Sequence, residues 1–298
     1  MVPPHRILAA IDFSEPSRIA LTMAARLAAY GSAELRVLHA EDPLLCAAAQ
    51  IHGLNLSVQA LEELQAFVAA TALPSTVLVH SHVVGGEAIE TICTVARREL
   101  AEVIVIGTHG MSGVERLVFG STAEGVLRRS EIPVLLVPPT WAPPSLSTVD
   151  LSGTGPIVVG VDFTAGSLEA MSAAFRLARA LQTSLELVHV VPALPVIERW
   201  QPHARESVDR RVEEARMELA RLARGLTMGV TVSTRVETGP VAEYIANGAR
   251  RGAGREPLLV LGRRRPRGHG DAPGAIAYRV LSLAHVPTLM FMATETQD

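Results

Sequence analysis

The sequence contains no lysine: all 27 basic residues among its 298 residues are arginines. This absence excludes Schiff-base chemistry, attachment of pyridoxal phosphate, a phosphate-binding loop built on lysine, and regulation by lysine acetylation. The favoured explanation is codon bias in a GC-rich genome, which also accounts for the many alanines. The protein therefore works without a side-chain amine.

Cysteine, long apolar runs and net charge are scarce as well. The two cysteines, Cys46 and Cys93, form no CxxC pair, which suggests a reducing compartment. No apolar run approaches the ~20 residues of a membrane span, and residues 1–6 lead into an expected strand without a signal peptide. The net charge of −3 gives no electrostatic reason to bind nucleic acid. We therefore expect a cytoplasmic protein that contacts neither membranes nor nucleic acid.

What the chain does contain is an internal repeat. The tetrapeptide at 11–14 recurs at 161–164, an offset of 162 − 12 = 150 residues, and the tripeptide at 37–39 returns at 187–189. Later pairs drift slightly, with 239 − 86 = 153 for Gly86 and Gly239. Because such pairs follow one another in order, we interpret the chain as a duplicated unit with a few loop insertions.

Each half shows five short apolar runs that alternate with helical patterns. This alternation predicts βαβ units and a parallel sheet covered by helices on both faces. In the first half we expect strands at about 6–11, 34–40, 76–84, 102–107 and 133–137. In the second half we expect them at about 157–162, 184–191, 229–236, 257–262 and 287–292.

A proline-rich stretch at 138–144 separates the two halves. Prolines at this density cannot join a central strand, and they favour a stiff, extended connection. We therefore place a domain boundary near residue 148, with domains at 1–147 and 148–298, each close to the usual domain size.

A glycine loop after the fourth expected strand carries the clearest functional signal. The apolar run 103–106 is followed by Gly107-Thr108-His109-Gly110, then nine residues, then Gly120-Ser121-Thr122 at the start of an expected helix. Glycines between a buried strand and a helix let backbone N–H groups come close to an anion. The loop lacks the lysine of a Walker A loop and the tight spacing of a dinucleotide fingerprint.

The pattern G-x2-G-x9-G-[ST] resembles the ATP-binding motif of the universal stress protein family, strongly in residues 5–138 and more loosely in 156–292. The resemblance implies an α/β fold of two tandem Rossmann-like domains, each with a five-stranded parallel sheet of order 3-2-1-4-5 and helices on both faces. In such sheets a ligand lies where the strand order reverses, here between strands one and four. The resemblance also implies ATP binding in the N-terminal domain and a role in stress response or signalling.

The same resemblance implies individual nucleotide contacts. Asp12 matches the family aspartate that contacts the adenosine part of ATP, and an ionised carboxylate accepts hydrogen bonds from hydroxyl or amine groups but repels phosphate. The start of the helix at Gly120 suits phosphate oxygens. A plain cap or turn role is the alternative at both places. The expected contacts are Ala10, Ile11, Asp12, Ala40, Gly107, His109, Gly110, Gly120, Ser121 and Thr122, with any Mg2+ held through the phosphates.

The second half departs from the motif. Arg265 stands where Gly110 would be, and Gly274-Ala275 replaces Gly120-Ser121. The arginine puts a side chain where backbone should approach the ligand, and alanine lacks a hydroxyl. We therefore expect a degenerate second domain without the usual nucleotide site, and we interpret the arginine-rich run 263–267 as a solvated loop, with anion binding as the alternative.

Other functions remain open. A slow ATP hydrolase, or another adenine-nucleotide enzyme of the same α/β group, would need a base or nucleophile beside the phosphates, and the loop offers only His109, Glu115 and Arg116. An FAD binder of the electron-transfer flavoprotein type would need a further flavin domain. His80 and His82 share a strand face, as metal ligands could, but no third ligand is evident, and we expect no metal site.

The tandem arrangement also predicts how the domains associate. Family members with a single repeat commonly pair through their fifth strands, which covers an exposed sheet edge. The stretch 139–155 has 155 − 139 + 1 = 17 residues and spans up to roughly 56–61 Å when extended. We expect an intramolecular pseudo-dimer in which the two fifth strands meet antiparallel, and the sequence leaves a homodimer of whole chains open.

Overall fold

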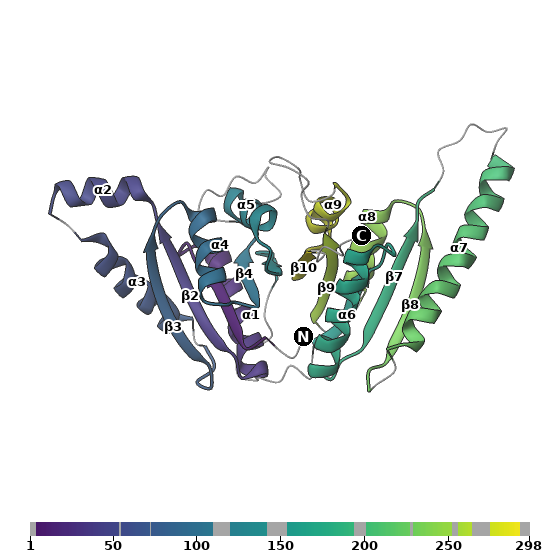
Figure 1. Cartoon of the computed structure of the whole chain (residues 1–298), viewed down its shortest axis with the longest axis horizontal. Helices are drawn as coiled ribbons and strands as arrows, with labels where there is room; N and C mark the ends of the chain where they lie inside the picture. Colours follow the sequence, from purple (N-terminus) through teal and green to yellow (C-terminus); the bar gives the residue numbers. More distant parts are fainter. Residues whose placement is uncertain are drawn as a thin grey trace. The chain divides into compact units, whose positions relative to one another are not determined.

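The computed structural model describes residues 4–53, 55–71, 73–109, 120–141, 154–193, 201–226, 229–251, 256–263 and 275–292. The chain divides into two compact units, Met1–Leu151 and Ser152–Asp298. In each unit helices separate consecutive strands along the chain (Figure 1), and a strand occupies each of the ten predicted places. The expected boundary at residues 147 and 148 lies outside the described residues.

The N-terminal unit is built on a parallel sheet with the order β3-β2-β1-β4-β5. β1 lies between β2 and β4, so that Ala10 is beside Leu38 on one side and Ile106 on the other. The carboxyl ends of these three strands therefore meet at one edge of the sheet. The strands are β1 (Arg6–Ala10), β2 (Glu34–Glu41), β3 (Leu78–Gly85), β4 (Val103–Gly107) and β5 (Val134–Val137).

Helices cover both faces of this sheet. The right-handed crossovers of a parallel sheet put α1 and α3 on one face and α4 and α5 on the other. In agreement, the Arg18 guanidinium of α1 lies 4.2 Å from the centre of the Phe67 ring of α3. A fully buried core of leucine and isoleucine side chains, such as Leu8, Leu38 and Ile104, joins the layers. The helices are α1 (Glu15–Gly31), α2 (Pro43–Ile51), α3 (Leu56–Ala70), α4 (Ala88–Arg98) and α5 (Ser121–Arg129).

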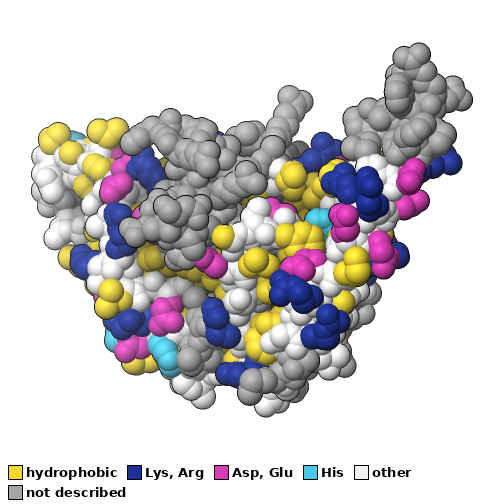
Figure 2. Space-filling model, turned by 45° about the vertical axis from the view of Figure 1, so that its right-hand side comes forward, with side chains coloured by type: hydrophobic (Ala, Val, Ile, Leu, Met, Phe, Trp, Pro, Cys, Tyr) yellow, Lys and Arg dark blue, Asp and Glu magenta, His cyan; other side chains and the backbone are white. Residues whose placement is uncertain are grey.

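Between β2 and β3 the chain forms two helices, α2 and α3. Asp42 begins α2 by accepting a hydrogen bond of 2.7 Å from the backbone N–H of Leu44. Gly53, at a φ of 71°, follows the end of α2. The α2 helix presents Leu44, Leu45 and Ile51 with exposed fractions of 79%, 63% and 83%. Hydrophobic side chains accordingly gather at this end of the unit (upper left in Figure 2).

The C-terminal unit repeats the same architecture. Its sheet has the order β8-β7-β6-β9-β10, again with every described pairing parallel. The predicted fold class, two tandem Rossmann-like units of five parallel strands in the order 3-2-1-4-5, is therefore confirmed. The elements are β6 (Thr154–Gly160), α6 (Ala165–Ala180), β7 (Leu185–Val191), α7 (Gln201–Arg224), β8 (Val232–Thr238), α8 (Val241–Arg250), β9 (Glu256–Arg263), α9 (Ala275–Ala284) and β10 (Thr288–Met292).

Candidate functional site

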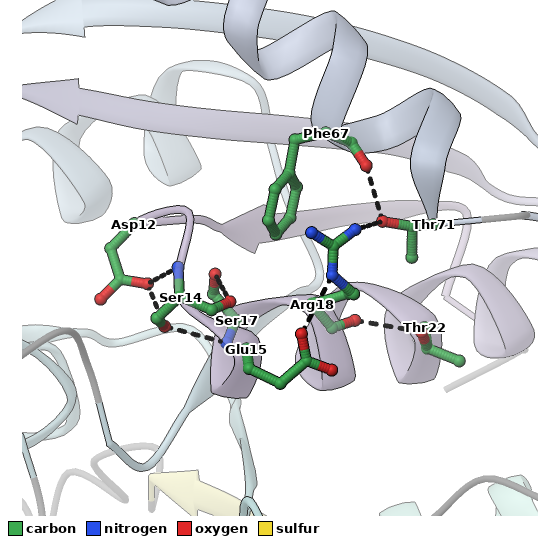
Figure 3. A network of polar contacts seen from close by, with 8 residues as sticks. All are labelled: Asp12, Ser14, Glu15, Ser17, Arg18, Thr22, Phe67 and Thr71. Carbon is green, nitrogen blue, oxygen red and sulfur yellow. Dashed lines mark hydrogen bonds and ion pairs between the residues drawn. The ribbon is translucent and has the colours of Figure 1, made fainter. Parts of the chain in front are cut away.

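The turn that follows β1 is built around Asp12. One oxygen of its carboxylate, Oδ1, accepts hydrogen bonds from the backbone N–H of Ser14 at 3.1 Å and from the Ser14 hydroxyl at 2.5 Å. Ser14 Oγ in turn accepts from the backbone N–H of Ser17 at 3.3 Å, which begins α1. Figure 3 shows this chain of contacts. Asp12 therefore has the turn role that we considered as an alternative. Its Oδ1 atom accepts both of the hydrogen bonds from Ser14.

An aromatic contact holds the same turn in a left-handed backbone conformation. Phe13 has a φ of 63°, which is uncommon for a residue with a bulky side chain. Its ring packs against His39, with 4.4 Å between the ring centres, and edge-on against Phe67 at 5.8 Å. His39 Nδ1 also lies 2.9 Å from the carbonyl oxygen of Ile11, so His39 has a structural role at this turn.

A polar network anchors the first turns of α1 to α3. Arg18 contacts Glu15 at 3.1 Å and the Thr71 hydroxyl at 3.2 Å, and that hydroxyl donates to the carbonyl oxygen of Phe67 at 2.7 Å. Figure 3 shows the Arg18 guanidinium beside the Phe67 ring. Because the Glu15 side chain is 71% exposed, its ion pair adds little stability, and the network mainly orients the turn that carries Asp12.

On the other side of β1, the end of β4 requires a glycine. A Cβ atom at Gly107 would lie 3.0 Å from the carbonyl oxygen of Pro16, a backbone atom of α1. Beyond it, Thr108 N donates to the carbonyl oxygen of Val137 at 3.0 Å, and Gly120 N donates to the carbonyl oxygen of Thr108 at 2.7 Å. The start of α5 is therefore fixed directly beside the end of β4, although the intervening residues 110–119 lie outside the described part of the chain.

These elements enclose a cavity of about 280 Å³ at the point where the strand order reverses. Nine of the ten residues expected from the sequence line it, and the tenth, Gly110, lies outside the described residues. The nine are Ala10, Ile11, Asp12, Ala40, Gly107, His109, Gly120, Ser121 and Thr122.

The sequence interpretation missed the apolar wall of this cavity. Ala88 and Ile92 of α4 line it together with Leu38 and Ile106. Ile92 stands out in the sequence only because Ile245 repeats it, and no local pattern shows that α4 leans over the strand ends. The remaining lining residues are Ser17, His39 and Ala123.

The two sides of the cavity differ in chemistry. On the β2 side, Ala40 and the α4 residues offer apolar surface and backbone groups. On the β4 side, Ser121 and Thr122 carry hydroxyls on the first turn of α5, whose N-cap Gly120 has no side chain to accept from the helix N–H groups. Asp12 lies between them, at the end of β1. Such a cavity suits an elongated ligand with an uncharged end and an anionic end.

The equivalent place in the C-terminal unit keeps the turn and changes the rest. Asp162 Oδ1 accepts from Thr164 N at 3.0 Å and from the Thr164 hydroxyl at 2.5 Å, as Asp12 does from Ser14. Arg263 is the last residue of β9 and only 3% exposed, so the expectation of a solvated arginine run is wrong at its first residue. Arg263 is buried because it still belongs to β9, whereas a solvated loop would begin only after it. Arg265 and Gly274 lie outside the described residues.

Of the histidines on β3, His80 is exposed, and His82 is half-buried near an ionic cluster of Arg36, Glu34 and Glu99. Arg36 of β2 contacts Glu99 at 2.6 Å and Glu34 at 3.1 Å. Burial lowers the pKa of His82, and the positive charge of Arg36 adds to this effect, while Glu99 opposes it. Within the described residues, no group of three His, Cys, Asp or Glu side chains is arranged to hold a metal ion.

Fold and site together define a class: a doubly wound α/β protein with two tandem parallel sheets and a ligand-sized cavity where strand order reverses. Among the helices of the described residues, none combines the length and hydropathy needed to cross a lipid bilayer.

The model of the universal stress protein family matches this chain twice, at residues 4–138 and 153–291. The chain therefore belongs to the universal stress protein family, as its glycine motif predicts. The two matches fall in the two compact units.

Individual relatives agree with this assignment. Universal stress protein A homolog 1 of Coxiella burnetii is 33% identical over 136 residues, which cover 44% of this chain and 94% of that protein. Universal stress protein YxiE of Bacillus subtilis is 27% identical over 145 residues, 45% of this chain and 98% of that protein. The crystal structure of a universal stress protein from Archaeoglobus fulgidus superimposes with a TM-score of 0.62 over 97% of this chain and 99% of that one, at 18% identity.

Proposed function

We propose that the N-terminal unit binds ATP and that the chain acts through this binding in the stress response that its family membership supports. One observation carries the proposal. The residues of the glycine motif and the aspartate after β1, far apart in sequence, line the same cavity. The fold brings these positions to one sheet edge, but it does not dictate that they carry an aspartate, glycines and hydroxyls, and function depends on the site and not on the fold.

The adenosine part would occupy the β1–β2 side. Here Leu38, Ala40 and Ile92 give an apolar surface for a flat ring, and the small side chain of Ala40 lets backbone groups reach its edge. Asp12 would accept hydrogen bonds from the ribose hydroxyls, since one of its oxygens already holds the turn and fixes the direction of the carboxylate.

The phosphates would lie at the start of α5. Gly107 brings backbone close to the ligand, and Ser121 and Thr122 add hydroxyls to the positive end of the helix dipole. Three or four charge-assisted hydrogen bonds at ~1.5–3 kcal/mol each, with up to ~2 kcal/mol from the helix end, exceed the ~8 kcal/mol of micromolar affinity before ordering and desolvation are subtracted. Micromolar binding is thus attainable without lysine. Any Mg2+ would be held through the phosphates.

We favour binding over turnover because the acidic and histidine side chains that line the cavity already make structural contacts. Among the described lining residues these are Asp12, His39 and His109, and each contacts its neighbours: Asp12 holds Ser14, His39 contacts the Ile11 carbonyl, and His109 Nδ1 lies 2.9 Å from the Thr108 hydroxyl. Glu115 and Arg116 lie outside the described residues. We therefore propose at most slow hydrolysis.

Calorimetric titration of the full chain with ATP tests the proposal. We expect micromolar binding at one site per chain, and release of ADP much slower than ligand exchange. Two equivalent sites, or no heat of binding, would overturn it. The antiparallel pairing of the two fifth strands, a homodimer of whole chains and a cytoplasmic location stay predictions from the sequence.

A further inference from the structure

The C-terminal unit contains a second cavity, of about 540 Å³, at the place that corresponds to the N-terminal cavity. Asp162, His189 and Gly262 line it, as the residues that they repeat line the first cavity. His189 Nδ1 lies 2.7 Å from the carbonyl oxygen of Val161, which repeats the contact of His39. The frame of the site is therefore retained, and any difference in ligand must come from the other lining residues.

Three of those other positions carry larger and more apolar side chains, whereas Gly160 and Val161 are smaller than Ala10 and Ile11, which they repeat. Val190 replaces Ala40 (190 − 40 = 150) and Val241 replaces Ala88 (241 − 88 = 153). At the helix start, Ile276 replaces Thr122 (276 − 122 = 154), and the residue before it is alanine instead of serine. The first turn of α9 thus lacks both hydroxyls that face the first cavity. The aliphatic lining residues are Val161, Val190, Val241, Ile245, Leu261, Ile276 and Val280.

The second cavity is nevertheless larger than the first, at about 540 Å³ against about 280 Å³. Protein interiors are packed to crystal density, with few voids larger than a water molecule. A concave volume of several hundred Å³ with aliphatic walls and a few polar groups is the usual form of a site for a small apolar or amphipathic molecule.

The mouth of the cavity is apolar as well. Ile276 lies in the first turn of α9 and lines the cavity, and 54% of its surface is exposed. In the N-terminal unit a threonine hydroxyl stands at this place. An exposed isoleucine offers nothing to a phosphate group, whereas a hydrocarbon chain entering here would cover its surface.

Among the described lining residues of this aliphatic cavity, one is an arginine. Arg263 is 3% exposed, and its planar guanidinium presents donors in a fork that matches a carboxylate. Asp162, an acidic residue of the described lining, is exposed and accepts hydrogen bonds from Thr164. The cavity therefore combines a hydrocarbon wall with a buried positive charge at the end of β9.

From these observations we propose that the C-terminal cavity binds a small amphipathic carboxylate of the fatty-acid class. The hydrocarbon chain lies among the aliphatic side chains, and the carboxylate contacts the Arg263 guanidinium. Bidentate contact with arginine is specific for a carboxylate in a way that contact with a hydroxyl is not. The inference does not depend on ATP binding in the N-terminal unit.

Calorimetric titration of the full chain with decanoate and with decanol is the first test. We expect one decanoate per chain, a negative heat capacity change from apolar burial, and affinity at least tenfold higher than that for decanol. Saturating ATP should leave decanoate binding unchanged. Absence of decanoate binding below its micellar range, equal affinities for the two probes, or competition by ATP would each overturn the proposal.

Two exposed positions in the same unit give a matched pair of variants. Ile276→Asp places a carboxylate at the mouth and should lower decanoate affinity at least tenfold. Met217→Asp changes a residue of α7 that is 60% exposed and does not line the cavity, and it should leave the affinity unchanged. Equal effects of the two variants would overturn the proposal. Arg263→Met should reduce decanoate affinity to that of decanol, and if this variant does not fold, the pair of exposed variants still decides.

Discussion

The backbone N–H of Gly120 donates a hydrogen bond of 2.7 Å to the carbonyl oxygen of Thr108. This bond joins the residue after β4 to the N-cap of α5, so the two described ends of the glycine loop lie side by side. The start of α5 is thereby held at the sheet edge, where Gly120, Ser121 and Thr122 line the cavity.

The close approach of Pro16 to Gly107 makes that glycine necessary for stability. Gly107→Ala would place Cβ 3.0 Å from the Pro16 carbonyl oxygen and 3.1 Å from its carbon, and should destabilise the N-terminal unit by about 1–3 kcal/mol. Gly85→Ala is the control, because no heavy atom lies within 4 Å of a Cβ there. Urea denaturation should show a lower midpoint for the first variant alone, and equal midpoints would contradict the steric argument.

The start of α5 should determine recognition of the phosphates. The double variant Ser121→Ala, Thr122→Ile copies the helix start of the C-terminal unit and removes two hydroxyls from the cavity. We expect ATP affinity to fall at least tenfold, the equivalent of about 1.4 kcal/mol, while adenosine affinity changes less than twofold. Calorimetry with both ligands measures this. An equal loss for ATP and adenosine would place the phosphates elsewhere.

Asp12 and Asp162 form a natural pair for testing the aspartate. Asp12→Asn keeps Oδ1 as an acceptor for the Ser14 N–H and hydroxyl, so the turn should survive, but it removes the charge. Since hydrogen bonds to charged groups are worth ~1.5–3 kcal/mol, ATP affinity should fall by about tenfold or more. Asp162→Asn should not alter ATP binding. If both variants bind ATP as the parent does, Asp12 serves only the turn.

Stability should fall in acid in two stages, from groups on β2, β3 and the end of α4. Burial lowers the pKa of His82, so the unfolded chain takes up its proton first and stability drops as pH falls below the ordinary histidine range near 6.5. A hydrogen bond from Arg98 and the charge of Arg36 lower the pKa of Glu99, whose contribution is present at neutral pH and is lost below the ordinary glutamate range near 4.3.

The variant His82→Gln separates these stages. Between pH 6.5 and 5 its free energy of unfolding should depend less on pH than that of the parent chain, as measured by urea denaturation across pH. His52→Gln, which changes an exposed histidine, is the matched control and should follow the parent curve. Parallel curves for His82→Gln and the parent would exclude His82 as a source of the acid sensitivity.

The sequence predicted the sheet and much of the cavity lining for one physical reason. Strand ends in a parallel sheet meet at one edge, so residues directly after β1, β2 and β4, such as Asp12, Ala40 and Gly107, are brought together by topology alone. The position of Ile92 was not predictable in this way, since its approach depends on how α4 packs across the sheet. The burial of Arg263 was hidden for a similar reason: neighbouring arginines resemble a solvated run until the end of β9 is located.

The left-handed turn at Phe13 has a mechanical consequence. The ring of Phe13 touches Phe67, and Phe67 also stacks under Arg18, so α3 supports the peptide that orients the Asp12 carboxylate. Any displacement of α3 is therefore transmitted to the ligand cavity. α2 precedes α3 in the chain and exposes Leu44 and Ile51 to its surroundings. A contact made with α2 would thus alter ligand affinity through α3, without direct contact with the cavity.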